Sequence, residues 1–362
     1  MAAEPVTIVI VNWNGREFLA ACLESVLAQE CPGGVRVIVL DNGSTDGSQD
    51  YLAAEFPQVE LVANEPNNYA AANNRGVDMA KGSYAMLLNT DTELAPGCVA
   101  ELVAALKADA KAAAAAPKIV FPDGRLCTTG IEQREDLYWV DRDQGVADDG
   151  QAGPPQRVLG PSGCCVLFRV EAWRAVGGQD ESFHMYYEDV DLALALNGAG
   201  WHSLYVPKAR CTHIGHGSIK KAKTWKDELG ERNRLLVLAR HFPDRFVAEL
   251  VRSPWFQSGA PDQVRELLPL CARRWSPDEK VDGEGLMLDL MMAMRDEVRA
   301  HAGELDARWG EHRNLPKILE EREEWIGKLL EEVARLRVWR LPGRRLKPGE
   351  RSFLTRLRDG GS

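Results

Sequence analysis

The sequence predicts an α/β fold in which a mostly parallel central sheet is flanked by helices. Three observations support this prediction. Short apolar runs alternate with stretches of helical periodicity between Val6 and Leu88. The first run, Val6–Val11, is rich in β-branched residues, which are typical of strands. Each run ends in a polar turn, and strands that alternate with helices pair in parallel through right-handed crossovers.

The predicted elements follow one another in a regular order. Apolar residues recur every three or four positions between Arg16 and Gln29, which predicts a helix after the first strand. The next predicted elements are a strand at 35–40, a helix at about 48–55, a strand at 59–63, a helix at about 70–81 and a strand ending at Leu88. A helix from about Gly97 to Lys111 is expected to run into an alanine-rich tail, before a strand at 118–120.

Regular structure is harder to assign between Gln133 and Pro155, which is acidic and rich in glycine. We expect this segment to be a mobile loop over the functional site. Regularity returns with an apolar strand at 164–168, a helix near 171–176 and a strand at 203–206. Beyond Arg245 apolar residues recur at helical spacing, which predicts a helical C-terminal extension with a possible dimer contact along 326–336.

Composition excludes several classes of protein. With 362 residues, 45% of them hydrophobic, the chain has material for one large domain and a smaller appended part. The sequence shows no signal-peptide pattern and no run of about 20 apolar residues. None of the eight cysteines forms a Cys-x-x-Cys pair, so we interpret them as reduced residues of a cytoplasmic protein.

The formal charge of −10 is unevenly distributed. Residues 335–358 include nine basic side chains and one acidic one, so the rest of the chain is more acidic than the total indicates. An acidic main body argues against a nucleic-acid partner. Apolar residues lie between the arginines of the tail, a pattern that suits peripheral contact with an anionic membrane at the inner face of the cell. A tail that packs on the protein or stays disordered is the alternative.

The strand that ends at Leu88 is followed by the polar residues Asn89, Thr90 and Asp91. In open α/β sheets, ligands bind at the carboxyl ends of the parallel strands. A carboxylate at that edge can bind a divalent cation that keeps its other positions for water and substrate phosphates. Alternatively, these residues cap a following helix.

Asp41 ends the second predicted strand in the same way. Two acids at neighbouring strand ends can hold a nucleoside on one side and a metal-bound diphosphate on the other. An Asx-turn formed by Asp41 is the alternative. The chain contains neither Gly-x-Gly-x-x-Gly after the first strand nor Gly-x-x-x-x-Gly-Lys-Ser/Thr. A bound nucleotide would therefore be held by side chains and a metal rather than by a glycine-rich loop.

Two later stretches carry further candidate groups. Glu188, Asp189 and Asp191 lie at a predicted helix start, where one carboxylate can act as a general base or all can be solvated. His213 and His216 lie in a glycine-containing loop and can serve a metal or a phosphate, although such histidines are often structural.

These stretches, in this order, give the chain a clear resemblance. It resembles the family 2 glycosyltransferases with the GT-A fold, particularly the bacterial rhamnosyltransferase-like branch, over roughly Val6–Arg245. The segments that carry the resemblance are Val9–Gly15, Asp41–Gly47, Asn73–Gly76, Leu87–Thr92, Gly177–Phe183, Tyr187–Leu192 and His213–Ser218. The resemblance implies a catalytic domain at 1–245. The helical periodicity and the basic residues beyond it predict a helical region at 246–334 and a basic tail at 335–362.

The resemblance also implies roles for individual residues. Asp189, with Glu188 beside it, would be the catalytic base, and Asp91 and His213 would bind Mg²⁺ or Mn²⁺. The nucleotide sugar would be contacted by Val11, Asn12, Asp41, Asn73, Asn89 and Thr90. The chain departs from the common pattern at three of the motif positions: Asn89 replaces an acid, Asn73 replaces an arginine, and Asn68-Tyr69 replaces Gly-Phe.

The implied activity is metal-dependent, inverting transfer of a sugar from a nucleotide-diphosphate sugar such as dTDP-rhamnose. The acceptor would be a hydroxyl of a glycan or of a lipid-linked molecule in surface polysaccharide synthesis. Two alternatives remain: a protein of this fold that binds nucleotide sugars or glycans without catalysis, and a sugar-phosphate nucleotidyltransferase. The latter needs a glycine-rich basic loop after the first strand, which Asn12–Gly15 does not supply.

Overall fold

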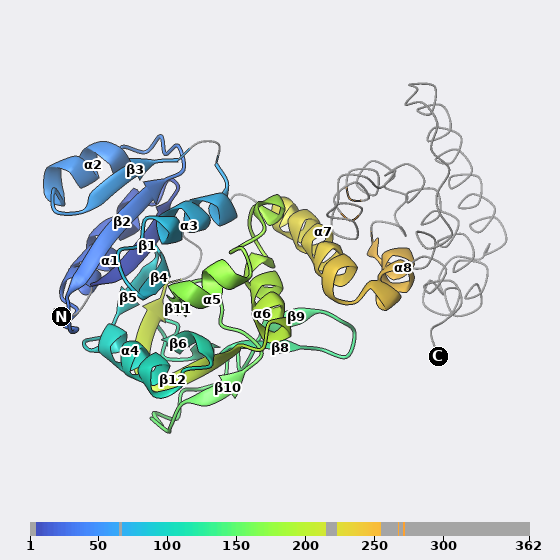
Figure 1. The fold of residues 1–362 in the computed structure, drawn as a ribbon. Coiled ribbons are helices and arrows are strands. Elements are labelled where there is room, and N and C mark those ends of the chain that lie inside the picture. Colours follow the sequence, from blue (N-terminus) through green and yellow to red (C-terminus); the bar gives the residue numbers. More distant parts are fainter. Residues whose placement is uncertain (1–4, 65–66, 215–222, 255–266, 268–270, 272–362) are drawn as a thin grey trace. The chain divides into compact units, whose positions relative to one another are not determined.

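A computed structural model of the chain describes residues 5–64, 67–214, 223–254, 267 and 271 (Figure 1). The chain divides into two compact units after Leu229. The first unit is an α/β domain, and the described part of the second is helical. The domain boundary predicted at residue 245 lies within the last described helix, α8 (Pro243–Arg252).

The first unit is built on one mixed sheet. Its eight main strands lie in the order β10-β12-β6-β11-β4-β1-β2-β3, and β5 and β7 pair with β12 and β6. The strands along the sheet are β10 (Gln156–Val158), β12 (His202–His213), β6 (Ala112–Val120), β11 (Cys165–Arg169), β4 (Tyr84–Asn89), β1 (Val6–Asn12), β2 (Val35–Asp41) and β3 (Glu60–Ala63), with β5 (Thr92–Leu94) and β7 (Leu126–Thr128) at its rim. The pairs around β1 are parallel, as predicted, whereas β11 runs antiparallel to both of its neighbours.

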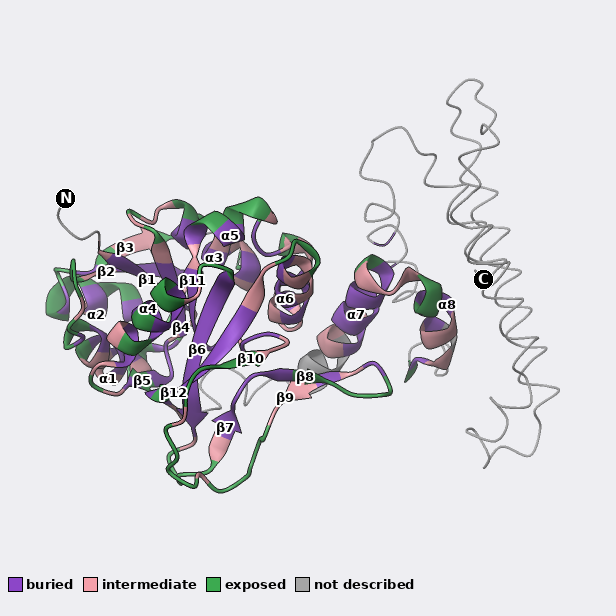
Figure 2. Ribbon diagram, turned by 60° about the horizontal axis from the view of Figure 1, so that its bottom comes forward, coloured by how far each residue is buried: buried purple, intermediate pink, exposed green. Residues whose placement is uncertain are grey.

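Helices cover both faces of this sheet. The helices of the first unit are α1 (Arg16–Leu27), α2 (Ser48–Glu55), α3 (Tyr69–Asp78), α4 (Cys98–Ala108), α5 (Val170–Ala175) and α6 (Glu188–Gly198), with a short 3₁₀ helix η1 (Glu181–Phe183). Ile8 and Ile10 of β1 share a core with α1, α2 and α4, whereas Val9 and Val11 share the opposite core with α3, α5 and α6. This split follows from the alternation of side chains along a strand. Figure 2 shows the result, with buried strands between helices whose outer surfaces are exposed.

One glycine is required for this packing. A Cβ atom added to Gly76 of α3 would lie 2.2 Å from Cγ1 of Val9, a distance that real side chains do not allow. The absence of a side chain at Gly76 therefore lets α3 approach β1 closely.

The alanine-rich tail predicted after the fourth helix is a strand. Residues Ala112–Val120 form β6, in which all nine residues are buried between β11 and β12. Alanine favours helices in isolation, so local preference predicted the wrong structure here. The position of the segment in the middle of the sheet, with alanine side chains on both covered faces, overrides that preference.

The segment predicted to be a mobile loop is attached to the domain. Its first part forms a hairpin of β8 (Ile131–Gln133) and β9 (Trp139–Asp141). Further on, Asp148 is held by Lys118 Nζ at 2.7 Å and by Arg210 Nη1 at 2.6 Å. Burial raises the pKa of Asp148, but hydrogen bonds from Lys118, a backbone N–H and Arg210 outweigh it and lower the pKa to about 2.

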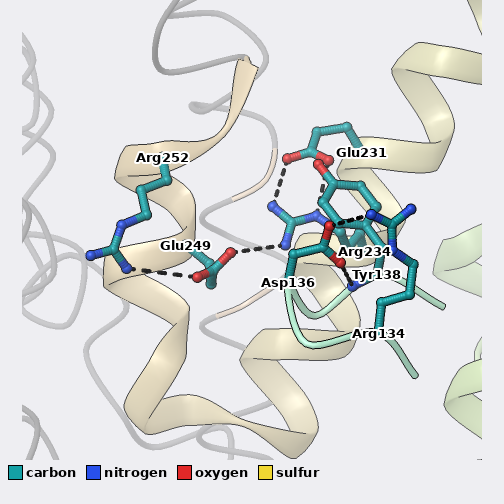
Figure 3. A network of polar contacts seen from close by, with 7 residues as sticks. All are labelled: Arg134, Asp136, Tyr138, Glu231, Arg234, Glu249 and Arg252. Carbon is teal, nitrogen blue, oxygen red and sulfur yellow. Dashed lines mark hydrogen bonds and ion pairs between the residues drawn. The ribbon is translucent and has the colours of Figure 1, made fainter. Parts of the chain in front are cut away.

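The described part of the second unit contains the end of α7 (Lys223–His241) and α8. Arg234 is fully buried there, and its guanidinium contacts Glu231 at 2.9 Å and Glu249 at 3.2 Å (Figure 3). Arg252 extends this network to Glu249 at 3.7 Å. The charge of the buried Arg234 is therefore balanced by carboxylates of the same unit.

Figure 3 also draws the turn between β8 and β9 of the first unit. In this turn Asp136 accepts hydrogen bonds from Arg134 and from the backbone N–H of Tyr138.

The predictions for most of the C-terminal region lie outside the described residues. These are the helical stripe with its dimer contact at 326–336 and the basic tail at 335–362. Within the described residues, no helix combines the length and the apolar character needed to cross a membrane.

Candidate active site

Strand register brings the predicted polar residues to one edge of the sheet. Asn12 at the end of β1 pairs with Asp41 at the end of β2, and Val11 pairs with Asn89 at the end of β4. These strands are parallel, so their carboxyl ends share the edge at which α/β proteins bind ligands. Val11 itself is buried in the core shared by α3, α5 and α6.

Asp41 is held in the ionised form by its neighbours. Its Oδ2 accepts a hydrogen bond from Asn12 Nδ2 at 2.8 Å, and its Oδ1 accepts from the Ser44 backbone N–H at 2.9 Å and from Gln49 at 2.8 Å. Burial raises the pKa of Asp41, but these hydrogen bonds outweigh it and lower the pKa below its ordinary value. The bond to Ser44 is the local turn contact considered above, and it coexists with the contact across the sheet edge.

The turn after β1 is crowded against the end of β4. A Cβ atom added to Gly15 would lie 2.7 Å from Oδ1 of Asn12 and 3.0 Å from Oγ1 of Thr90. Oδ1 of Asn12 is buried and has no hydrogen-bond partner among the described residues. An acceptor of this kind can receive a donor group from a ligand.

Asp91 faces a histidine that is distant in the sequence. After Asp91 the chain forms β5 rather than a helix, so the helix-cap alternative is wrong. β5 pairs with the end of β12, which places His213 Nε2 3.3 Å from Asp91 Oδ1. His213 is the last residue of this strand, which is longer than predicted, and not part of a loop. Nδ1 of the same ring lies 3.5 Å from the thiol sulfur of Cys127. His216 lies outside the described residues.

The donor atoms of Asp91 and His213 fit one divalent cation. Two ligand atoms at adjacent octahedral positions, each about 2.1 Å from the ion, lie roughly 3.0 Å apart. The observed separation of 3.3 Å is close to that value. No cluster of three or more His, Cys, Asp or Glu residues suited to a metal occurs in the described part of the chain. A cation at this site would therefore depend on water and substrate phosphate for its other ligands.

The acid pair Glu188 and Asp189 begins α6 in a strained stretch of backbone. His184, Tyr186 and Tyr187 have φ angles of 65°, 69° and 66°, which non-glycine residues rarely adopt. Asp189 Oδ2 accepts a hydrogen bond from the Gly163 backbone N–H at 2.9 Å, and its Oδ1 accepts from Val190 N–H at 2.8 Å.

Burial sets the protonation of both acids. It raises the pKa of Asp189 against the effect of the two backbone hydrogen bonds. The pKa of Glu188 is raised well above its ordinary value, first by burial and then by the charge of Asp189. Oε2 of Glu188 is buried without a hydrogen-bond partner among the described residues. The two backbone hydrogen bonds stabilise the charged form of Asp189, whereas Glu188 Oε2 has no such contact among those residues.

The acid pair and the strand-end residues are linked through two backbone residues. Gly163 donates its N–H to Asp189, while the next carbonyl, that of Cys164, accepts from the Asn89 N–H at 2.9 Å. This short connection places Asp189 and the Asn89–Asp91 turn at the same edge of the sheet, although about a hundred positions separate them in the sequence. Sequence reasoning did not identify Gly163 or Cys127 as site residues. Neither lies in a motif, and only the fold brings the Gly163 backbone N–H and the Cys127 thiol to this edge of the sheet.

Asn73 takes a different position from the one expected for a diphosphate contact. Its side chain is buried, and Nδ2 donates to Gln179 Oε1 at 3.1 Å. The hydroxyl of Tyr69, also in α3, donates to Asn89 Oδ1 at 2.8 Å. The structure thus connects two positions, 69 and 89, at which the sequence departs from the common pattern.

Comparison with known proteins decides the family. The model of glycosyl transferase family 2 matches residues 7–177. The N-acetylglucosaminyl-diphospho-decaprenol L-rhamnosyltransferase of Mycobacterium tuberculosis (strain CDC 1551 / Oshkosh) is 33% identical over 231 residues, which cover 57% of this chain and 75% of that protein. The chain belongs to glycosyl transferase family 2. The succinoglycan biosynthesis protein ExoA of Rhizobium meliloti (strain 1021) is 29% identical over 56% of this glycosyltransferase and 63% of its own length.

Solved structures confirm the predicted GT-A fold of this glycosyltransferase. GalNAc-T7, solved with UDP, GalNAc and Mn²⁺, superposes with a TM-score of 0.52 at 19% identity, over 68% of this chain and half of that chain. Residues 1–349 of TarS from S. aureus superpose with a TM-score of 0.51 at 12% identity, over 85% of this chain and 93% of that chain. At these identities the likeness concerns the fold alone.

Proposed function

We propose that this glycosyltransferase is inverting and metal-dependent, and that it transfers a hexose from a nucleotide-diphosphate sugar to an acceptor hydroxyl. The observation that carries the proposal is the backbone link through Gly163 and Cys164, which brings Asp189 beside the Asn89–Asp91 turn. A base and a candidate cation site at one edge of the sheet are the two groups that such a displacement requires.

Asp189 is the proposed general base. The acceptor oxygen forms a bond to the anomeric carbon and gives its proton to the Asp189 carboxylate, while the bond to the diphosphate oxygen breaks and that oxygen keeps the electron pair. The raised pKa of Asp189 makes it a stronger base than an exposed aspartate. Each of its oxygens accepts one backbone hydrogen bond and retains a lone pair for the acceptor proton.

Asp91 and His213 are the proposed ligands of Mg²⁺ or Mn²⁺. A bound cation would offset the negative charge that develops on the leaving diphosphate. Asp41 and Asn12 form the proposed nucleoside site, because the ionised Asp41 accepts hydrogen bonds and the buried Asn12 Oδ1 has an acceptor position to offer. Thr90 lies against the same turn, next to Gly15.

The rhamnosyltransferase relative supports a choice of donor and acceptor. Its name describes a rhamnosyl transfer to a lipid-linked N-acetylglucosaminyl diphosphate. This supports an activated rhamnose, for which we propose dTDP-rhamnose, as the donor and a glycan or lipid-linked hydroxyl, in surface polysaccharide synthesis, as the acceptor. The basic tail would then bring this cytoplasmic enzyme to the inner membrane surface that carries such an acceptor.

A donor panel tests the proposal. The full chain is incubated with dTDP-rhamnose and the common UDP- and GDP-sugars, with Mg²⁺, Mn²⁺ or EDTA, and release of nucleoside diphosphate is measured. We expect metal-dependent turnover of one donor, with Asp91→Ala and Asp189→Asn each reducing it at least 100-fold. Asp123→Asn, at an exposed turn, is the matched control. Tight donor binding with no turnover, or normal activity in Asp189→Asn, would contradict the proposal.

A further inference from the structure

Tyr69 lies between the two halves of the candidate active site. It is the first residue of α3, and its hydroxyl contacts Asn89 Oδ1 at 2.8 Å and the Gly163 carbonyl oxygen at 3.4 Å. Asn89 leads to Asp91, and the N–H of Gly163 donates to Asp189. The Tyr69 phenol therefore contacts both Asn89, at the strand end proposed to bind the sugar nucleotide, and Gly163, whose N–H holds the proposed base.

The direction of the hydrogen bonds follows from the partners. Both of its partner atoms, the Asn89 amide oxygen and the Gly163 carbonyl oxygen, are acceptors, so the Tyr69 hydroxyl is the donor. The phenol has a single proton, and its shorter contact is to Asn89 Oδ1. The main hydrogen bond therefore runs from Tyr69 to Asn89.

This hydrogen bond determines what Asn89 presents to a ligand. Its amide oxygen accepts the Tyr69 proton with one of its lone pairs, which holds the amide group in one orientation. Its amide nitrogen makes no hydrogen bond within the part of the chain that the structure describes, and the side chain is only half-buried. An amide nitrogen donates hydrogen bonds and cannot bind a cation. Residue 89 therefore offers a neutral donor where a carboxylate would offer a negative charge.

We infer that Tyr69 is a positioning residue that fixes Asn89 as a hydrogen-bond donor to an oxygen of the nucleotide sugar, so that residue 89 is not a metal ligand. This inference rests on the proposed function. It also explains why tyrosine and asparagine occur together at positions 69 and 89: phenylalanine at 69 would leave the asparagine amide free to turn over.

The experiment is a double-mutant cycle on donor binding. Tyr69→Phe, Asn89→Ala and the double variant of the full chain are titrated by calorimetry with Mg²⁺, without acceptor. The ligands are the sugar nucleotide that the wild type turns over in the donor panel and the corresponding nucleoside diphosphate. We expect Tyr69→Phe and Asn89→Ala each to raise Kd for the sugar nucleotide about 3- to 10-fold, the range of one neutral hydrogen bond. Because Tyr69 acts through Asn89, the double variant should bind no more weakly than Asn89→Ala alone.

A second arm separates ligand binding from metal binding. Mn²⁺ affinity, measured by electron paramagnetic resonance without nucleotide, should be unchanged in both single variants. Asn89→Asp keeps an acceptor for Tyr69 but replaces the amide nitrogen by a charged oxygen, and we expect it to weaken binding of the sugar nucleotide at least 10-fold. Tyr205→Phe is the matched control, because Tyr205 lies on β12 against Arg142, 5.5 Å from its guanidinium, rather than at the strand ends.

The outcomes are distinguishable. A loss confined to the sugar nucleotide supports a contact to the sugar, and an equal loss with the nucleoside diphosphate supports a contact to that part of the donor. Additive effects in the cycle, weakened Mn²⁺ binding by Asn89→Ala, or wild-type affinity in Asn89→Asp would overturn the inference while leaving the glycosyltransferase activity in place. A wild type that neither binds nor turns over any sugar nucleotide would refute the proposed function, and this inference with it.

Discussion

Replacing Glu188 by glutamine tests whether burial keeps this carboxyl group protonated in the folded protein. The side chain is 5% exposed, and its Oε2 has no hydrogen-bond partner among the described residues. Burial and the charge of Asp189 raise the pKa of Glu188 well above its ordinary value of 4.5. Glutamine has nearly the same shape as the protonated acid and cannot ionise.

The sign of the pH dependence follows from the raised pKa. A group whose pKa is higher in the folded than in the unfolded chain stabilises the fold fully below pH 4.5, and this stabilisation is lost as the pH rises toward the folded pKa. Each pH unit in that window costs the wild type about 1.4 kcal/mol of unfolding free energy relative to the variant. The first unit ends at Leu229, and for a unit of that size this free energy corresponds to a difference in Tm of about 3–6 °C per pH unit.

The assay is thermal unfolding of the wild type and Glu188→Gln, followed by circular dichroism at pH 5, 6, 7 and 8. We expect the two proteins to unfold within a few degrees of each other at pH 5 and the variant to become progressively more stable at higher pH. Glu132→Gln, on an exposed position of β8, is the matched control and should show no such divergence. A difference between Glu188→Gln and wild type that stays constant with pH would refute the reasoning.

Two further predictions concern contacts of the site and of its supporting loop. Cys127→Ala removes the sulfur that lies 3.5 Å from His213 Nδ1. Because the imidazole ring loses this contact, we expect Mn²⁺ to bind about 10-fold more weakly, with recovery in Cys127→Ser. Equal Mn²⁺ affinity in the wild type and both variants would contradict this. Asp148→Asn removes a carboxylate held by Lys118 and Arg210, and should lower the unfolding free energy at pH 7 by about 1–2 kcal/mol after allowance for solvent screening. The lowered pKa of Asp148 means that its stabilisation is present above pH 3.8 and lost as the pH falls toward 2, so wild type and variant should converge in acid urea denaturation; a constant gap would count against the ion pairs.

The sequence predicted the sheet best where periodicity and strand-end chemistry agreed. The ends of β1, β2 and β4 lie together because a parallel register was implied by alternating strands and helices. The prediction was wrong at Ala112–Val120, where nothing local marks a strand, and the neighbouring strands that make it one are distant in the sequence. The extension of β12 to His213 was missed for the same reason, because its partner β5 has only three residues.

For the candidate site, the sequence indicated the acids and the histidine but not how they are held. The pairing of His213 with Asp91 could be expected from motif order, whereas the thiol of Cys127 behind the ring could not, since no spacing rule connects them. Asn73 shows the opposite case. A motif position predicted contact with a ligand, and the structure shows a buried side chain whose Nδ2 donates to Gln179 Oε1.

The costs of this fold are concentrated immediately before and at the start of α6. Three non-glycine residues between His184 and Tyr187 have left-handed backbone angles, each of which costs about 1 kcal/mol or more. Of the two acids that follow, Glu188 is buried and Asp189 is half-buried, and Oε2 of Glu188 lacks a partner among the described residues.

Contacts from other elements hold this segment in place. The carbonyl of His184 accepts a hydrogen bond from Ala70 N–H at 3.2 Å, and the ring of Tyr187 packs edge-on against Trp139 of β9, 6.1 Å away. A chain selected for stability alone would gain from an uncharged residue at Glu188 and from glycine at the left-handed positions. Strained backbone and two adjacent acids, one of them hydrogen-bonded to Gly163, occur together here, which is what a site needs if it must keep a base of raised pKa in one fixed position.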